Sequence, residues 1–221
     1  MVASVEQRIR HRSQQVGRDD VGRPEAGQTL VEFALVIPMV MLLVMAILEF
    51  ALGFNAFVGL NRASQNAAHL AAVTGNQLGA DCLILSRIEG DIQPPNDASD
   101  IRSVIIERTA LAGNVSYQQQ TYSKPGLWDC TLPDGTEVTV PYAPTANAGG
   151  QPGYPEEQRC PVLDGCAALD PPRSTVDNIG VRVQYRHRWA TPLSTIMDVL
   201  PGGSEGWTFT QRNIFRMEPT L

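Results

Sequence analysis

Several motifs on which enzymes and metal proteins depend are scarce or missing in this sequence. The 221 residues include three histidines and four cysteines, and the cysteines form no Cys-x-x-Cys pair. There is no Gly-x-Ser-x-Gly elbow, no glycine-rich phosphate loop, no His-Glu-x-x-His and no carboxylate pair that the sequence places together. We therefore predict that the protein is not an enzyme and that it holds no metal and no cofactor.

Positive charge is also in short supply. The net charge is −6, and an acidic balance argues against nucleic acid as a partner. The chain is 43% apolar, which at this length favours one globular domain beside one membrane helix.

Apolar residues, by contrast, form one long run. Almost every residue from 30 to 54 is apolar, and at ~1.5 Å per residue this run covers the ~30 Å hydrocarbon core of a bilayer with some tilt. A cleavable secretory signal is the alternative, but its apolar region is usually only ~7–15 residues long, and no Ala-x-Ala site closes this run. We predict a transmembrane helix over residues 28–58.

One acidic residue stands near the start of this helix. A carboxylate in a bilayer helix is costly unless it finds a partner, so Glu32 suggests a function. The simpler alternative is a glutamate at headgroup level, where the helix dipole favours negative charge. Gly27 favours the functional interpretation of Glu32, because a cut after Gly27 would create an α-amine on Gln28, close to the Glu32 carboxylate.

The motif Gly27-x-x-x-x-Glu32-Phe33 resembles the processing site of type IV prepilins. Residues 28–38, with Ile47-Leu48-Glu49-Phe50, are similar to the TadE-like pseudopilins of tight-adherence (Flp-type) pilus systems, and residues 209–219 are similar to the end of many such chains. The resemblance implies cleavage after Gly27 by a prepilin peptidase, Glu32 as the acid at position +5, and a role in pilus assembly.

The segment before the helix is a basic leader, residues 1–27, and we expect it to be disordered. Its arginines flank the apolar run on one side, so the positive-inside rule places the N-terminus in the cytoplasm. An arm that binds nucleic acid is the alternative, but Glu6, Asp19, Asp20 and Glu25 nearly cancel the charge.

Two further residues of the helix attract notice. Pro38 removes a backbone donor and should kink the helix, which membrane helices tolerate. Glu49 lies roughly 25 Å along the axis from Glu32 and should reach the opposite interface. We interpret Glu49 as an interfacial acid whose side chain extends to water, with a subunit contact as the alternative.

Beyond the membrane, the helix is predicted to continue through residues 61–73. Ala63, Ala67 and Ala71 recur at four-residue spacing, and such rows let helix backbones approach closely. We expect this row to be buried, either on the chain's own globular part or against neighbouring subunits. Gly75 suits the left-handed position that ends a helix. His69 is interpreted as a packing or surface residue.

The rest of the chain is predicted to mix helix and strand. Apolar residues between Asp97 and Gly113 recur at helical spacing and predict a second helix, while residues 78–92 fit either a short helix or a strand. Strands are predicted over residues 115–122, 136–140, 181–189 and 207–217, with a short helix or turn near 193–200. The polar face of residues 181–189 is rich in arginine, and we interpret it as solvated, with a contact to an anionic surface as the alternative.

Residues 123–178 are rich in proline and glycine and predict an extended loop or an insertion on the sheet. In an extracytoplasmic domain, the four cysteines predict two disulfides with three possible pairings. We favour Cys82 with Cys130 and Cys160 with Cys166. A zinc site is the alternative, but His11, His69 and His187 lie outside this segment, and Asp164, Asp170 and Asp177 form no recognisable calcium loop.

Together these features predict an α+β fold of the pilin type. It comprises a long N-terminal membrane helix that continues into a small extracytoplasmic domain, residues 59–221, with a short helix and an antiparallel sheet. The expected partners are a prepilin peptidase, other pilin-like subunits, the pilus assembly platform and the membrane. The alternative function is an uncleaved single-pass anchor that displays an adhesive or binding module.

Overall fold

The computed structural model describes residues 26–110, 112–113, 115–150, 152–161, 166, 169, 175–192, 194–195 and 206–218. Almost all of the predicted leader, 1–27, lies outside the described residues, as does most of the helix or turn predicted near 193–200. The chain divides into two compact units, Met1–Val44 and Met45–Leu221, which are described separately.

The first unit consists, in its described part, of the start of helix α2. This helix runs from Ala26 to Thr74, 49 residues, with Pro38 inside it. The helix is continuous on both sides of the proline, which bilayer helices accommodate because neighbouring groups satisfy the freed carbonyl. The predicted continuation through residues 61–73 is confirmed.

The second unit is built on a five-stranded antiparallel sheet with the order β5-β2-β1-β6-β7. Its strands are β1 (Ile101–Thr109), β2 (Ser116–Ser123), β5 (Ala143–Thr145), β6 (Asn178–His187) and β7 (Trp207–Arg216). A separate two-stranded sheet pairs β3 (Trp128–Thr131) with β4 (Glu137–Val140). The described residues also include three short 3₁₀ turns, η1 (Ala98–Asp100), η2 (Ala148–Gly150) and η3 (Glu156–Gln158).

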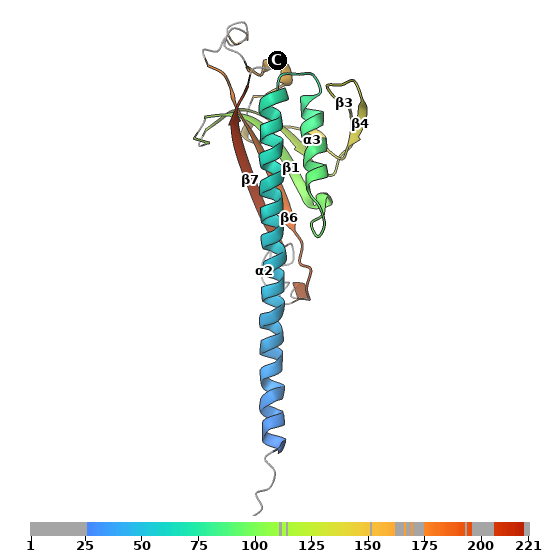
Figure 1. Ribbon diagram of the computed structural model, residues 1–221, viewed down its shortest axis with the longest axis vertical. Coiled ribbons are helices and arrows are strands. Elements are labelled where there is room, and N and C mark those ends of the chain that lie inside the picture. The colour runs from blue at the N-terminus through green and yellow to red at the C-terminus, as the bar shows by residue number, and fades with distance from the viewer. Residues whose placement is uncertain are drawn as a thin grey trace, which may run out of the picture. The chain divides into compact units, whose positions relative to one another are not determined.

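The part of α2 that belongs to this unit and helix α3 (Ala80–Asp91) lie over one face of the main sheet, with the β3–β4 hairpin beside α3 (Figure 1). The core forms between these layers. All three layers contribute fully buried side chains to it: Ala63, Ala67 and Ala71 of α2, Ile84 and Ile88 of α3, and Val104, Ile106, Val181 and Val183 of the sheet. The α+β class and the helix-plus-antiparallel-sheet architecture predicted from the sequence are confirmed.

Four predicted strands are present as β2, β4, β6 and β7, and β6 and β7 are neighbours in the sheet, as expected. The segment 78–92, which the sequence left open, is the helix α3. Its buried residues Asp81, Ile84, Leu85 and Ile88 recur at the i, i+3, i+4, i+7 spacing of a helix that packs on one side.

The second helix predicted between Asp97 and Gly113 is wrong, because this segment is strand β1. Ile101, Val104, Ile105 and Ile106 are β-branched, and such side chains favour strands. Since β1 lies inside the sheet, seven of its nine residues are buried, and the apolar positions therefore show no strict alternation. Asp97 does act as a cap, but for η1, where it accepts a hydrogen bond from the Ser99 N–H at 2.8 Å.

One other expectation is corrected. Gly75 does not have positive φ; it is required for space, because a Cβ there would lie 2.2 Å from the carbonyl oxygen of Ala71. The first described glycine with positive φ after α2 is Gly79, which precedes α3. Of the two alternatives for segment 123–178, the structure favours an insertion on the sheet, since the segment contains β3, β4 and β5, and β5 extends the main sheet by pairing with β2.

Candidate functional site

The predicted processing motif lies in the first turns of α2. Gly27 and Gln28 fall within the first turn, since the helix begins at Ala26. Glu32 and Phe33 follow one turn later, and both are exposed, Phe33 by 64%. The motif therefore leads without a break into the apolar part of the helix.

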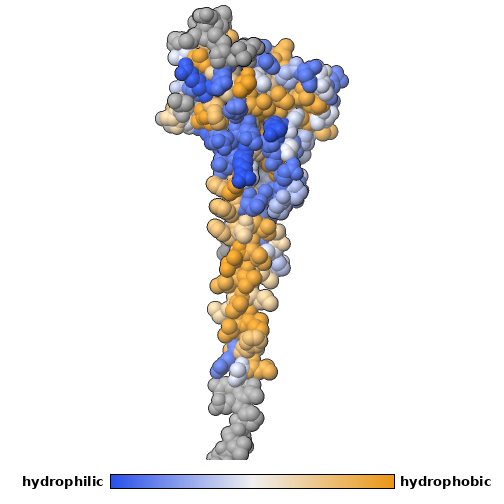
Figure 2. All heavy atoms as spheres, in the orientation of Figure 1, coloured by the Kyte–Doolittle hydropathy of each residue, from blue (hydrophilic) through white to orange (hydrophobic). Residues whose placement is uncertain are grey.

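The next turns of α2 have no polar face. All residues from 29 to 44 are exposed, and from Leu30 onward every one except Glu32, Ala34 and Pro38 is a large apolar residue. Figure 2 shows apolar side chains along this stretch. By length and composition, α2 is a helix that could cross a membrane. An apolar surface of this extent must be covered by lipid or by other helices.

Glu49 is buried against the chain's own domain, so the prediction that its side chain extends to water is wrong, whereas its place at the far membrane interface stays a prediction. Its side chain is 1% exposed, and its Oε1 atom lies 3.1 Å from Nε2 of His187. The backbone N–H groups of Ala190 and Thr191 donate to the same carboxylate at 2.9 to 3.2 Å. The acid thus ties α2 to the end of β6 and to the residues that follow it. No local pattern in the sequence linked Glu49 with His187.

A buried stripe on α2 begins at Glu49. It continues through Gly53, Ala56 and Leu60 to the predicted row of Ala63, Ala67 and Ala71, which are 0% exposed. Next to this row, the Ser64 hydroxyl donates to the carbonyl oxygen of Val181 at 2.9 Å. The row is therefore buried on the chain's own domain, which decides between the two alternatives. The exposed His69 packs edge-on against Phe215, as a surface or packing residue would.

A buried polar cluster lies where α3 begins. The Arg159 guanidinium, wholly buried, contacts Asp81 Oδ1 at 2.6 Å and donates to the carbonyl oxygens of Gly75 and Tyr154. The Tyr122 hydroxyl donates to Asp81 Oδ2 at 2.6 Å. Burial, reinforced by the charge of Asp81, raises the pKa of Tyr122 well above its usual range.

Helix α3 is capped from a distance. Its N-cap residue is Gly79, which has no side chain to act as a cap, and the carboxylate of Glu156 accepts hydrogen bonds from the N–H groups of Gly79 and Asp81 at 2.8 and 2.6 Å. Burial, and after it the nearby charge of Asp81, raises the pKa of Glu156.

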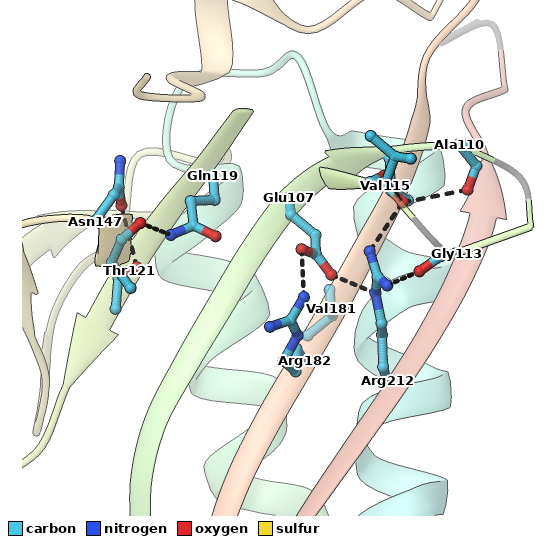
Figure 3. A network of polar contacts seen from close by, with 12 residues as sticks. Glu107, Ala110, Gly113, Val115, Gln119, Thr121, Asn147, Val181, Arg182 and Arg212 are labelled. Carbon is cyan, nitrogen blue, oxygen red and sulfur yellow. Dashed lines mark hydrogen bonds and ion pairs between the residues drawn. The ribbon is translucent and has the colours of Figure 1, made fainter. Parts of the chain in front are cut away.

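The opposite face of the sheet carries a second buried ion cluster (Figure 3). Glu107 of β1 is 0% exposed and lies between Arg182 of β6, at 2.8 Å, and Arg212 of β7. Arg212 also donates to the Gly113 carbonyl and to the Thr109 hydroxyl. Arg182, from the face that the sequence marked as basic, is thus paired with a buried carboxylate, which it shares with Arg212 of β7.

An open groove of about 750 Å³ lies between the start of α3, the β3–β4 hairpin and η3. The aromatic rings of Tyr122 and Trp128 stack along it, with centroids 5.4 Å apart. Four carboxylates line it, those of Asp81, Asp129, Glu156 and Glu157. Sequence reasoning missed this groove, because its walls come from five separate segments.

The cysteines are paired as favoured from the sequence. Cys82 of α3 is bonded to Cys130 of β3 with a Cα–Cα distance of 6.0 Å, and Cys160 to Cys166 with 5.3 Å. The first disulfide fixes the β3–β4 hairpin to α3. In the part of the chain that the structure describes, no group of three or more His, Cys, Asp or Glu side chains is placed to hold a metal ion.

Comparison with known families agrees with the reading of the N-terminal segment. Residues 27–69 match the family model described as TadE-like protein. The match covers the predicted processing motif, the apolar run and the start of the alanine row, and it confirms the family resemblance predicted from these residues. The chain matches none of the curated proteins and none of the solved structures with which it was compared.

Proposed function

Since residues 27–69 of this chain are TadE-like, we propose that the protein is a pseudopilin, or minor pilin, of a tight-adherence (Flp-type) pilus or a related secretion apparatus. One observation carries the proposal. The motif of Gly27, Glu32 and Phe33 opens a 49-residue helix whose next turns expose apolar residues on every side and whose second half is packed on the chain's own domain.

The topology follows from charge. The arginines of residues 1–27 stay in the cytoplasm, α2 crosses the inner membrane, and the second unit lies outside it. A span that ends near Glu49 has room for about 20 residues after Gln28, which matches the ~30 Å hydrocarbon core. In this proposal, the buried stripe that starts at Glu49 marks the point where the domain takes over from lipid as the cover of α2.

Processing would create a positively charged partner for Glu32. A prepilin peptidase cleaves after Gly27, and the new α-amine on Gln28 lies one helical turn from the Glu32 carboxylate along the sequence. When mature helices pack side by side, the amine of one subunit and the carboxylate of the next attract each other strongly in a medium of low dielectric constant. This short-range pair sets the axial register of neighbouring subunits.

The protein acts in this proposal as a structural subunit rather than as a catalyst. The domain is held to the second half of α2 by Glu49 and by the alanine row, so this half of the helix and the domain form one compact unit. Its partners are other pilin-like subunits and the assembly platform.

The processing step is tested by a bulky residue in place of Gly27. In cells that make the peptidase, Gly27→Leu should accumulate as the full-length chain, whereas the matched variant Gly90→Leu should be processed normally, because nothing lies within 4 Å of a Cβ at Gly90. Normal processing of Gly27→Leu would refute cleavage at this bond.

The register role is tested separately by Glu32→Gln, which removes the charge and keeps the shape. The variant should insert and be cleaved but should not support pilus assembly. Unchanged pilus assembly would show that the charge pair is not needed.

The alternative is an uncleaved anchor that displays a binding module, and the groove beside α3 is the observation in its favour. A mature chain that retains residues 1–27 would support it.

A further inference from the structure

The groove beside α3 is lined by negatively charged side chains, which would attract a cation. Asp129 and Glu157 stand exposed at its rim, and Asp81 and Glu156 lie deeper. The residues that line it, all in the described part of the chain, include no lysine, arginine or histidine. Of the nearby cations, Arg159 does not line the groove, because it is fully buried and its donors are directed to Asp81 and to two backbone carbonyls.

The groove also has an aromatic wall that is held in place before any ligand arrives. The Trp128 ring stacks on the buried Tyr122 ring with an angle of 20° between their planes, and Tyr122 is itself fixed by its hydrogen bond to Asp81. The strand that carries Trp128 is bonded to α3 through Cys130 and Cys82. A preformed wall lowers the entropic cost of binding.

Much of the remaining lining of the groove is formed by leucine and proline side chains. Leu78 is 71% exposed at one edge, and Leu132, Pro133, Pro144 and Pro155 line the sides. Prolines offer a flat apolar surface and no N–H donor. A ligand that fills this groove therefore needs an apolar or flat body with a positively charged end.

Of the two deeper acids, Asp81 is already paired with the Arg159 guanidinium at 2.6 Å, so Glu156 is the deeper acid that remains for a ligand. Glu156 is half-buried, and burial, with the charge of Asp81, raises its pKa, although the two N–H groups that it caps and the charge of Arg159 act in the opposite direction. A cation in the groove would interact favourably with Glu156 and with the rim acids Asp129 and Glu157. Charge complementarity thus identifies the class of ligand.

We propose that this groove binds an arginine side chain presented on an extended segment of a partner protein. The planar guanidinium can lie flat on an indole face while its forked donors bind carboxylates in a fixed geometry, whereas a lysine ammonium is a strongly hydrated point charge without that planar fork. The proposal holds whether or not the leader is removed, so it is independent of the proposed assembly role. A volume of about 750 Å³ accommodates more than one side chain, in keeping with a peptide segment.

The test uses the full chain in detergent micelles and a capped tripeptide, Ala-Arg-Ala, as the probe. Binding is followed by the NMR signal of the Trp128 indole N–H, which is assigned with Trp128→Phe. The arginine peptide should shift this signal in a saturable manner. The same peptide with citrulline, a neutral analogue, or with lysine should bind at least about tenfold more weakly.

The double variant Asp129→Asn/Glu157→Gln should weaken binding of the arginine peptide about tenfold, because both rim charges are removed while the groove keeps its shape. Glu218→Gln removes an exposed carboxylate that does not line the groove and should have no effect. Equal binding of the citrulline or the lysine peptide, no shift of the Trp128 signal, or an equal loss in Glu218→Gln would overturn the proposal.

Discussion

Glu49 on α2 and His187 at the end of β6 are 138 residues apart in the sequence, and their side chains meet at 3.1 Å. The Glu49 carboxylate also accepts hydrogen bonds from the backbone N–H groups of Ala190 and Thr191. Four donor–acceptor contacts thus converge on one acid at the start of the buried stripe of α2. This acid is the first residue at which the domain covers the helix.

The first prediction concerns this acid. Glu49→Leu leaves the two backbone donors without an acceptor, and the variant should lose about 1–3 kcal/mol of stability. Hydrogen exchange at Ala190 and Thr191 in the detergent-solubilised chain should rise accordingly. Glu218→Gln, which removes an exposed acid, is the control and should leave both amides unchanged. Unaltered protection in Glu49→Leu would mean that the contact does not hold the domain to α2.

The second prediction compares the two disulfides. Cys82–Cys130 spans 48 residues and Cys160–Cys166 spans six. In the chain-entropy account, the longer loop stabilises the fold by about 4 kcal/mol and the shorter by about 2 kcal/mol. Unfolding by urea should therefore show a larger loss for Cys82→Ser/Cys130→Ser than for Cys160→Ser/Cys166→Ser. The reverse order would contradict this account.

The third prediction is a loss of stability at alkaline pH. Burial, together with the charges of Asp81 and Glu89 respectively, raises the pKa of Tyr122 and Tyr142 above the ordinary value of 10.0. Between the unfolded and the folded pKa, the folded state keeps protons that the unfolded chain releases, so stability is present below pH 10 and falls as pH rises above it.

The measurement is urea unfolding from pH about 9 to about 12, with absorbance at 295 nm to follow tyrosine ionisation. Tyr142→Phe should reduce the slope of stability against pH, because one of the buried hydroxyls with a raised pKa is gone. Tyr117→Phe, at a ring that is 48% exposed, should not change it. Equal slopes for all three proteins would count against the assigned burial of Tyr142.

The fourth prediction separates two glycines. A Cβ at Gly75 would lie 2.2 Å from the carbonyl oxygen of Ala71 and 2.6 Å from Met217, whereas a Cβ at Gly90 meets nothing within 4 Å. Gly75→Ala should therefore destabilise the domain, and Gly90→Ala, inside α3, should stabilise it by about 0.5–1 kcal/mol. Thermal unfolding in the same detergent measures both. A Gly75→Ala variant as stable as the parent would show that the end of α2 is less tightly packed than described.

Local sequence patterns correctly predicted those helices and strands of which each face lies in a single kind of environment. The alternation of β6 reflects one buried face and one more exposed face, whereas the apolar run of α2 carries apolar side chains on every side of the helix; both elements were predicted. Strand β1 was mistaken for a helix because it is buried on both faces, which removes the alternation and leaves spacing that fits a helix by chance.

The functional features divide in the same way. Gly27, Glu32 and Phe33 lie within seven consecutive residues, so the sequence alone could suggest a processing motif; cleavage there stays a prediction. The hydrogen bonds around Glu49 and the groove at Trp128 depend on segments that meet only in the folded chain, so no local sequence pattern could predict them. The disulfide pairing was favoured from loop lengths alone, and it is the pairing present in the structure.

The central claim is that the chain is a processed subunit, and the N-terminus of the mature protein tests it most directly. The protein should be purified from the membranes of cells that make the prepilin peptidase, and its intact mass and N-terminal sequence determined. The account predicts a chain that begins at Gln28. A chain that still carries residues 1–27 in those cells would contradict it and would leave a membrane-anchored binding domain in its place.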